Sequence, residues 1–363
     1  MNSEDEVLCD LGTILLMQND CETIKEILLG VRHPVFSMAI IPYAALFCRS
    51  FQEYCNETLI DENTDQEIDD IRNSLKLYTR KYGKAKKEIT RADSEQDKEF
   101  REMLRFRILE KLNIHYNLGL YFDQNFNLVS NTQLIAYSLN INNLGDQQSS
   151  EKAYQLGYNV GQVVGSVSTR LAQVFTPGNI TLESKGIQMY YCDINTNKSD
   201  FLLPEYEKDM SLMLLHMLCN INFVKYMIGQ ILPHDNLWVF RLKYITMHNV
   251  WQGLTRLKAH VDNTESVDLA LSQKLASVTE DLNWMFPSNF RNCMMHYDMK
   301  NSGEMQIKEE FFNLDKPLYG LVESCFDGLS FEVYVEKIDT YQNSVECFLK
   351  GMFDFSKLTF TEQ

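Results

Sequence analysis

The chain carries little positive charge for its size. Its 363 residues include 34 lysines and arginines against 50 aspartates and glutamates, which gives a formal net charge of -16. A protein that coats nucleic acid through charge alone needs the opposite balance, because cations make its phosphate contacts. Any contact with nucleic acid must therefore come from a local basic patch.

Paired cysteines and metal-ligand motifs are also missing. The nine cysteines stand singly, with no C-x-x-C pair and no short spacing to a histidine, and no phosphate loop of the form G-x-x-x-x-G-K-[ST] occurs. Neither a zinc site nor a disulfide framework is indicated. Cysteines inside apolar helical patterns, such as Cys219 and Cys347, are expected to be reduced core residues. We therefore predict a cytoplasmic protein that uses no metal and no cofactor.

Long hydrophobic runs are absent as well. The longest apolar stretch covers residues 35–48 and contains Pro42, whereas a helix needs about 20 apolar residues to cross a bilayer. The N-terminus carries Glu4, Asp5 and Glu6 where a secretory signal would be basic. The sequence predicts a core helix at 35–48 and no association with a membrane.

What the chain does have is helical periodicity over most of its length. The length allows two or three domains with a sizeable core. We predict an N-terminal helical region at 1–115, a mixed segment with a helix and a β-hairpin at 116–203, and an antiparallel helical bundle at 204–356. The expected fold class is mainly α.

The mixed segment contains the few β-prone runs. One lies at 134–139, and a second lies at 187–197 with 200–203 as its candidate hairpin partner. Between these runs, residues 150–175 return to a helical pattern.

Basic residues gather between Arg72 and Arg91. Only two aromatic rings, Tyr78 and Tyr82, interleave with them, and ring stacking is what a single-stranded nucleic acid requires. The run is either a contact for nucleic acid or a solvated helix face that balances the acidic residues 61–67, and both interpretations stay open.

The C-terminal region has the most regular pattern. Residues 205–232 are apolar on nearly every side, which predicts a buried central helix. Apolar residues spaced three and four apart then run over 237–254, 271–285 and 331–352, with a short helix at 317–326. Long helices with narrow apolar seams are typical of an up-and-down bundle.

One short segment of this bundle gathers polar groups. After the break at Pro287 the sequence carries Arg291, Asn292 and His296. A helix that starts near Ser288 places Asn292 and His296 one turn apart, and the long Arg291 side chain can fold toward them. An imidazole transfers protons near neutral pH, and a guanidinium offers fixed donors to a phosphate. We expect the three groups to converge on one anion.

The pattern Arg291-Asn292-x-x-x-His296 resembles the R-[N/D/H]-x-x-x-H signature of HEPN domains (higher eukaryotes and prokaryotes nucleotide-binding), and the resemblance covers residues 204–356. It implies a metal-independent endoribonuclease of a bacterial toxin, abortive-infection or antiviral defence system. It also implies RNA as the substrate, a homodimer in which two motifs form one cleft, and an antitoxin or regulatory protein as a partner.

The resemblance assigns a role to each motif residue. His296 would handle the proton of the attacking 2′-hydroxyl or of the leaving 5′-oxygen, and Arg291 would neutralise the phosphorane. Asn292 would orient His296 or bind the phosphate, and products would carry a 2′,3′-cyclic phosphate. The alternative is a non-catalytic module of this type that binds a nucleotide or a protein partner.

Arg241 and His248 form a second arginine–histidine pair on one helical stripe. They are candidates for the substrate side of the cleft, although Arg241 equally suits a bundle ion pair. A structural interpretation also remains for the motif, in which Arg291 pairs with a carboxylate such as Asp281 or Asp298 and His296 is a satisfied bundle histidine.

Overall fold

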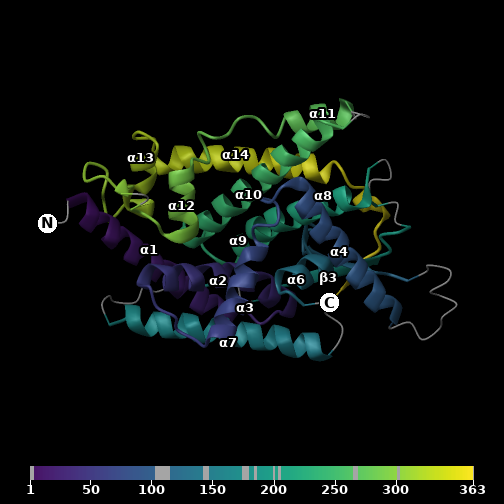
Figure 1. Cartoon of the computed structure of the whole chain (residues 1–363), viewed down its shortest axis with the longest axis horizontal. Coiled ribbons are helices and arrows are strands. Elements are labelled where there is room, and N and C mark those ends of the chain that lie inside the picture. Colours follow the sequence, from purple (N-terminus) through teal and green to yellow (C-terminus); the bar gives the residue numbers. More distant parts are fainter. Residues whose placement is uncertain are drawn as a thin grey trace.

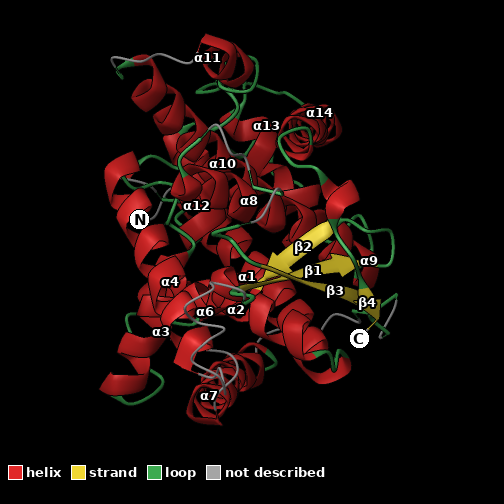
Figure 2. Cartoon of the chain, turned by 90° about the vertical axis from the view of Figure 1, so that its right-hand side faces the viewer, coloured by secondary structure: helices red, strands yellow, loops and turns green. Residues whose placement is uncertain are grey.

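The computed structural model describes residues 4–102, 115–141, 147–173, 180–183, 186–198, 201–202, 206–264, 269–300 and 303–362. The protein is mainly α-helical with one small antiparallel sheet, which confirms the predicted fold class at that level (Figure 1, Figure 2).

Four helices form the N-terminal region: α1 (Glu4–Gly30), α2 (Pro34–Cys55), α3 (Glu62–Ser74) and α4 (Tyr82–Glu102). Helix α2 starts on Pro34, because the fixed φ of proline suits the first turn of a helix. Helix α3 starts after Asp61, whose side chain accepts the backbone N–H of Thr64 at 3.1 Å. The basic run therefore spans the end of α3, a turn, and the first half of α4.

The sheet has the strand order β2-β1-β3-β4. Strand β1 (Leu118–Asp123) pairs antiparallel with β2 (Leu128–Asn131) and with β3 (Met189–Ile194), and the two-residue β4 (Thr361–Glu362) pairs with β3. Every residue of β1 and β2 is buried. The sheet lies at one end of the molecule, where helix α8 packs against β2 (Figure 2).

Two predictions for the mixed segment were wrong. Residues 134–139 lie mostly in helix α6 (Thr132–Ser138), because the Asn131 side chain accepts the N–H of Leu134 at 2.8 Å and starts a helix there. The predicted strand at 187–197 is present as β3, but its partners are β1 and β4. Phe201 and Leu202 of the expected hairpin lie outside any strand, and positions 200 and 203 lie outside the described residues.

The long helix predicted after the sheet is confirmed, and so are the helices at 237–254 and 331–352 and the helix at 150–175 as far as Leu171. Of the helix predicted at 317–326 only residues 321–325 are α-helical, because Leu318 and Tyr319 have positive φ values of 52° and 58°. The helices from this part of the chain are α7 (Gln147–Leu171), α8 (Lys208–Asn222), the π-helical η1 (Phe223–Ile228), α9 (Gly229–Ile231), α10 (Leu237–Asp262), α11 (Leu269–Ala276), α12 (Ser288–His296), η3 (Pro317–Gly320), α13 (Leu321–Cys325), α14 (Phe331–Lys350) and η4 (Phe355–Lys357).

The helix predicted over 271–285 ends early, at Ala276. Side chains from α10 and α14 donate hydrogen bonds to carbonyl groups of the segment that follows. Tyr341 donates its hydroxyl to the carbonyl of Val278 at 2.9 Å, and Tyr334 donates to the carbonyl of Met285 at 2.6 Å. These carbonyls are satisfied without a helix, so the segment crosses the bundle as a series of turns.

The helices stack in layers. Figure 1 shows α7 along the lower edge and α14 along the upper edge, with α2, α8 and α10 between them. One cluster of buried apolar side chains runs through these layers and includes Phe36 of α2, Leu212 of α8, Trp238 of α10 and Tyr334 of α14. The C-terminal helices therefore share their core with the N-terminal ones.

Two apolar helical stretches have the length and composition to cross a membrane, namely Pro34–Cys55 and Lys208–Ile231. Within them, 72% and 78% of the most apolar windows are buried against the rest of the protein. Both therefore serve as core helices in this structure, as the sequence predicts.

The two cysteines singled out from the sequence differ in position. Cys219 is buried in α8, as expected, whereas Cys347 is exposed on α14. The Cys347 prediction was wrong because α14 packs against the core through only one face, which carries Tyr334, Ile338, Val345 and Leu349.

Candidate anion site around Arg291 and His296

Helix α12 presents the predicted motif. The helix follows Pro287, whose extended backbone precludes an earlier start, and its buried face carries Phe290, Cys293, Met294 and Met295. Arg291, Asn292 and His296 are left half-buried at the edge of this face. The motif thus lies on a short amphipathic helix, and its polar groups reach the surface of the core.

The C-terminal end of α12 is held by the N-terminal helices. Ser50 of α2 donates its hydroxyl to the carbonyl of Met295 at 3.0 Å, and Thr13 of α1 donates to the carbonyl of Tyr297 at 3.3 Å. Tyr297 ends the helix in the left-handed conformation, at φ 54°. The backbone on both sides of His296 is therefore fixed by helices that lie far away in the sequence.

Arg241 belongs to this anchor. Its side chain is 3% exposed and forms a buried ion pair with Asp20 of α1, and it donates to the carbonyl of Met294. The ring of Tyr297 lies beneath its guanidinium, and the Tyr297 hydroxyl donates to Asp20 at 2.6 Å. These contacts match the ion-pair interpretation of Arg241 and place its charge in the interior, away from the motif's polar edge.

His296 lies at the surface of the core. Its side chain is 24% exposed, and Nδ1 lies 3.9 Å from Oε2 of Glu53. It borders a pocket of about 370 Å³ together with Tyr54 and Lys300. The imidazole is therefore open to a ligand, and the distance to Glu53 is too long for a hydrogen bond.

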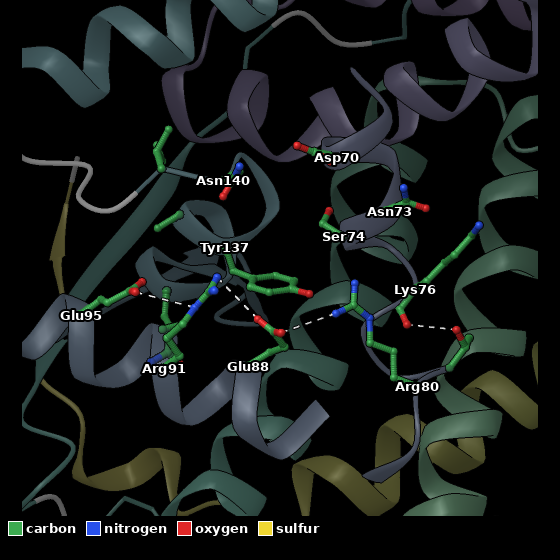
Figure 3. Close-up of a pocket in the computed structure, with 15 residues that line it drawn as sticks. Asp70, Asn73, Ser74, Lys76, Arg80, Glu88, Arg91, Glu95, Tyr137 and Asn140 are labelled. Carbon is green, nitrogen blue, oxygen red and sulfur yellow. Dashed lines mark hydrogen bonds and ion pairs between the residues drawn. The ribbon is translucent and has the colours of Figure 1, made fainter. Parts of the chain in front are cut away.

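Arg291 and Lys76 are cations without a carboxylate partner. Within the described residues, neither lies within ion-pairing distance of an aspartate or a glutamate, and Arg291 instead contacts the sulfur of Met295 at 3.8 Å. Lys76 follows α3, and Figure 3 shows its side chain extending away from the pair formed by Arg80 and Glu88. One turn before it, Arg72 is paired with Asp69 at 2.8 Å.

Helix α10 is the platform that brings these groups together. Asn249 donates its side-chain amide to the carbonyl of Leu75 at 3.0 Å, which holds the end of α3. The ring of Phe290 meets that of Tyr244 edge-on at 5.0 Å, which holds α12. His248 lies on α10 between these two attachment points.

The pKa shifts of the two histidines indicate which charged groups interact with them electrostatically. Burial lowers the pKa of His296 to about 4, and the charges of Arg72, Lys76 and Arg291 act in the same direction, while Glu53 opposes them. Burial also lowers the pKa of His248 to about 4, again with a contribution from Arg291. Both imidazoles are therefore neutral at pH 7.

We call these five residues, Arg72, Lys76, His248, Arg291 and His296, the basic cluster. Burial lowers the pKa of Lys76 as well, with Arg72 and Arg291 adding to the effect. Like charges held together in a protein with a net charge of -16 disfavour each other, so an anion that bridges them relieves that repulsion. The arrangement is suited to binding a phosphate group.

The sequence pointed to Arg291, Asn292, His296 and His248 but not to the contribution of α3. Arg72 and Lys76 were visible only as part of a basic run, and Lys76 lies in the turn that follows α3. Asn292 is near His296 in sequence, yet the structure has no hydrogen bond between these two described side chains. No hydrogen bond between the described side chains therefore supports the expected role of Asn292 in orienting His296.

Among the residues that the structure describes, no group of three His, Cys, Asp or Glu side chains is placed to hold a metal ion. Comparison with known family models, with curated proteins and with solved structures finds no match for this chain. The interpretation of the site therefore rests on its own residues and geometry.

Proposed function

We propose that this protein is a metal-independent endoribonuclease of the HEPN type and that the basic cluster is its active site. The proposal rests on His296, partly exposed on α12, together with Arg291 of the same helix and Lys76, two cations outside ion-pairing distance of any described carboxylate, whose charges lower the pKa of His296. A phosphodiester next to a ribose 2′-hydroxyl matches both the neutral histidine and the cations. Its cleavage needs a base for the hydroxyl proton and positive charge beside the phosphate.

The chemistry assigns one task to each group. The 2′-oxygen attacks the adjacent phosphorus while His296 takes its proton, and the bond from phosphorus to the 5′-oxygen breaks. Arg291 and Lys76 stabilise the extra charge on the phosphorane. The 5′-oxygen receives a proton, so the products are a 2′,3′-cyclic phosphate and a 5′-hydroxyl.

A second proton donor completes this reaction. In the proposed homodimer it is the protonated His296 of the second copy, facing the first across a shared cleft. The pKa of about 4 applies to the empty site, and a bound phosphate would raise it by adding negative charge beside the imidazole. We place this activity in the cytoplasm of a bacterium, in a toxin or antiviral defence system that an antitoxin or regulatory protein controls.

The test uses purified full-length protein and a structured RNA in the presence of EDTA. His296→Ala is expected to lower the cleavage rate by about 100-fold or more, as loss of a general base does. The matched control is His234→Ala, because His234 is an exposed histidine in a turn. Products are mapped for cyclic phosphate ends, and the same strand made of deoxynucleotides should remain intact.

Two results would contradict the assignment of a ribonuclease activity to His296. Equal cleavage by wild type and His296→Ala would show that the activity comes from elsewhere, and cleavage of the all-deoxy strand would show that no 2′-hydroxyl attack occurs. Arg291→Ala is expected to slow cleavage, whereas Arg170→Ala, which removes an exposed arginine from α7, should not.

The second candidate is a module that binds a nucleotide or a protein partner without cleaving RNA. It is favoured by the acidic lining of the His296 pocket, because Asp10, Glu53 and Asp298 line the same cavity as the imidazole. Carboxylates there repel a second stretch of phosphates. Tight, His296-dependent binding of a partner with no RNA cleavage at any enzyme concentration would decide for this candidate.

A further inference from the structure

A second cavity lies between α3, α4 and α6, and its lining shares no residue with the His296 pocket (Figure 3). Its volume is about 710 Å³, which falls within the roughly 300–1,000 Å³ typical of small-molecule sites. The cavity is outside the C-terminal region that resembles HEPN domains, and Lys76 is the one residue of its lining that also belongs to the basic cluster.

Two guanidinium groups in this cavity share one carboxylate. Figure 3 shows Glu88 between Arg80 and Arg91, at 3.7 and 3.5 Å, and Glu95 on the far side of Arg91 at 3.7 Å. These separations exceed the usual length of a charged hydrogen bond, about 2.7–2.9 Å. Across the described ranges neither guanidinium group makes a hydrogen bond, so the donors of both side chains can turn to a ligand.

The cavity also contains an unused acceptor. Gln133 of α6 is 1% exposed, and its Nε2 donates to Asp93 at 3.4 Å, but its Oε1 has no hydrogen-bond partner among the described residues. Buried side-chain oxygens are normally paired. A ligand with a hydroxyl or amino donor would satisfy this atom.

The shared carboxylate restricts the ligand further. An anion that binds Arg80 and Arg91 displaces Glu88, which then needs new donors of its own. The P–OH donors of a bare phosphate sit on the anion itself, whereas a sugar phosphate carries additional hydroxyl groups several bonds away from its anion. Tyr137 adds a ring at the centre of the cavity (Figure 3), and such rings pack on sugars and bases.

We propose that this cavity binds a sugar phosphate, either free or as part of a mononucleotide. The phosphate lies between Arg80 and Arg91, the sugar hydroxyls donate to Glu88 and to Gln133, and Tyr137 packs against the sugar or base. The cavity shares Lys76 with the basic cluster, but none of the residues that hold the sugar phosphate takes part in the proposed cleavage.

The test is calorimetric titration of the full-length protein with ribose 5-phosphate, AMP and inorganic phosphate. We expect ribose 5-phosphate or AMP to bind at least about tenfold more tightly than phosphate, since their sugar hydroxyls can donate to Glu88 and Gln133 while the phosphate stays between the two arginines. An AMP affinity well above that of ribose 5-phosphate assigns a nucleotide, and equal affinities assign the free sugar phosphate.

The Arg80→Ala/Arg91→Ala variant should lose at least about tenfold in affinity, because both phosphate donors are gone. Arg80→Lys/Arg91→Lys retains the charge and the ion pairs yet loses the planar fork, so it should also weaken binding. The matched control is Lys84→Ala/Lys87→Ala, which removes the same charge from exposed positions of α4, and it should bind as wild type does.

Three outcomes would overturn the proposal: no binding of either sugar phosphate at about 10 mM, phosphate binding as tightly as ribose 5-phosphate, or unchanged affinity in both arginine variants. Titrating His296→Ala separates this site from the ribonuclease proposal. Its affinity for the sugar phosphate should equal that of the wild type, whether or not the protein cleaves RNA.

Discussion

The guanidinium carbon of Arg241 lies 3.9 Å from the centre of the Tyr297 ring, one residue beyond His296. Asp20 closes this arrangement by pairing with Arg241 and accepting the Tyr297 hydroxyl. A buried charge pair with a ring stacked on it tolerates little movement. The position of the His296 backbone is therefore tied to α1 and α10 as well as to its own helix.

Asp20→Asn should destabilise the protein by about 3–5 kcal/mol, because it leaves the Arg241 charge buried without its counterion. Urea denaturation followed by circular dichroism measures this. The control is Asp10→Asn, on the same helix and partly exposed beside Lys300, which should cost less than about 1 kcal/mol. The double variant Asp20→Leu/Arg241→Met should lose less than Asp20→Asn, and a larger loss would contradict the account of an uncompensated charge.

Lys76→Met should raise the pKa of His296. The wild-type value of about 4 results from burial and from the charges of Arg72, Lys76 and Arg291, and removing a cation makes the imidazolium easier to form. The pKa is read from the pH dependence of the His296 ring signal in the NMR spectrum. Lys84→Met, on the exposed face of α4, should leave it unchanged. Identical titrations of wild type and Lys76→Met would show that Lys76 does not face the site.

His216→Leu should make the protein less sensitive to acid. His216 is 1% exposed in α8, both ring nitrogens lack a partner among the described residues, and burial lowers its pKa from 6.5 to about 3. Between these values the unfolded chain binds a proton that the native state does not, so the free energy of unfolding falls as the pH drops below 6.5.

The expected slope from this one group is about 1.4 kcal/mol for each pH unit. Urea melts of wild type and His216→Leu at pH 7 and at pH 5 measure it, with His234→Gln as a control at an exposed position. The free energy of unfolding of His216→Leu minus that of wild type should increase between pH 7 and pH 5. A constant difference would show that His216 is protonated or solvated in the native protein.

Gly320→Ala should destabilise the protein far more than Gly303→Ala. Both glycines have positive φ, 85° and 87°, so an alanine costs about 1–2 kcal/mol at either place. At Gly320 the added Cβ would also lie 2.1 Å from the carbonyl oxygen of Phe311, whereas nothing lies within 4 Å at Gly303. Thermal melts compare the two variants. Equal losses would mean that the Phe311 segment moves aside without cost.

The sequence predicted the buried C-terminal helices well because their apolar residues recur at helical spacing over long stretches. It failed where a local contact changed the outcome. A β-prone run became α6 through the cap at Asn131, and the helix after α11 is replaced by turns whose carbonyls bind Tyr334 and Tyr341. Strand β1 escaped notice because both of its faces are buried, which removes the alternation that marks a strand.

The motif was visible in the sequence, but its surroundings were not. Arg291 and His296 stand out because they are close together in the chain. Glu53 approaches them from α2, which bonds to α12 through Ser50, and Lys76 through the packing of the end of α3 on α10. Neither spacing nor periodicity reports such contacts. The same holds for the cavity at Arg80 and Arg91, whose depth depends on where α6 lies against α3 and α4.

The anchor of α12 bears on how the protein is made. Asp20 and Tyr297 are 277 positions apart, so a ribosome has synthesised most of the chain before their contact can form. Chains released early carry the partners of the motif helix but lack Arg291 and His296 themselves. The proposed active site therefore cannot form during synthesis until α12 has emerged and reached its partners on α1, α2 and α10.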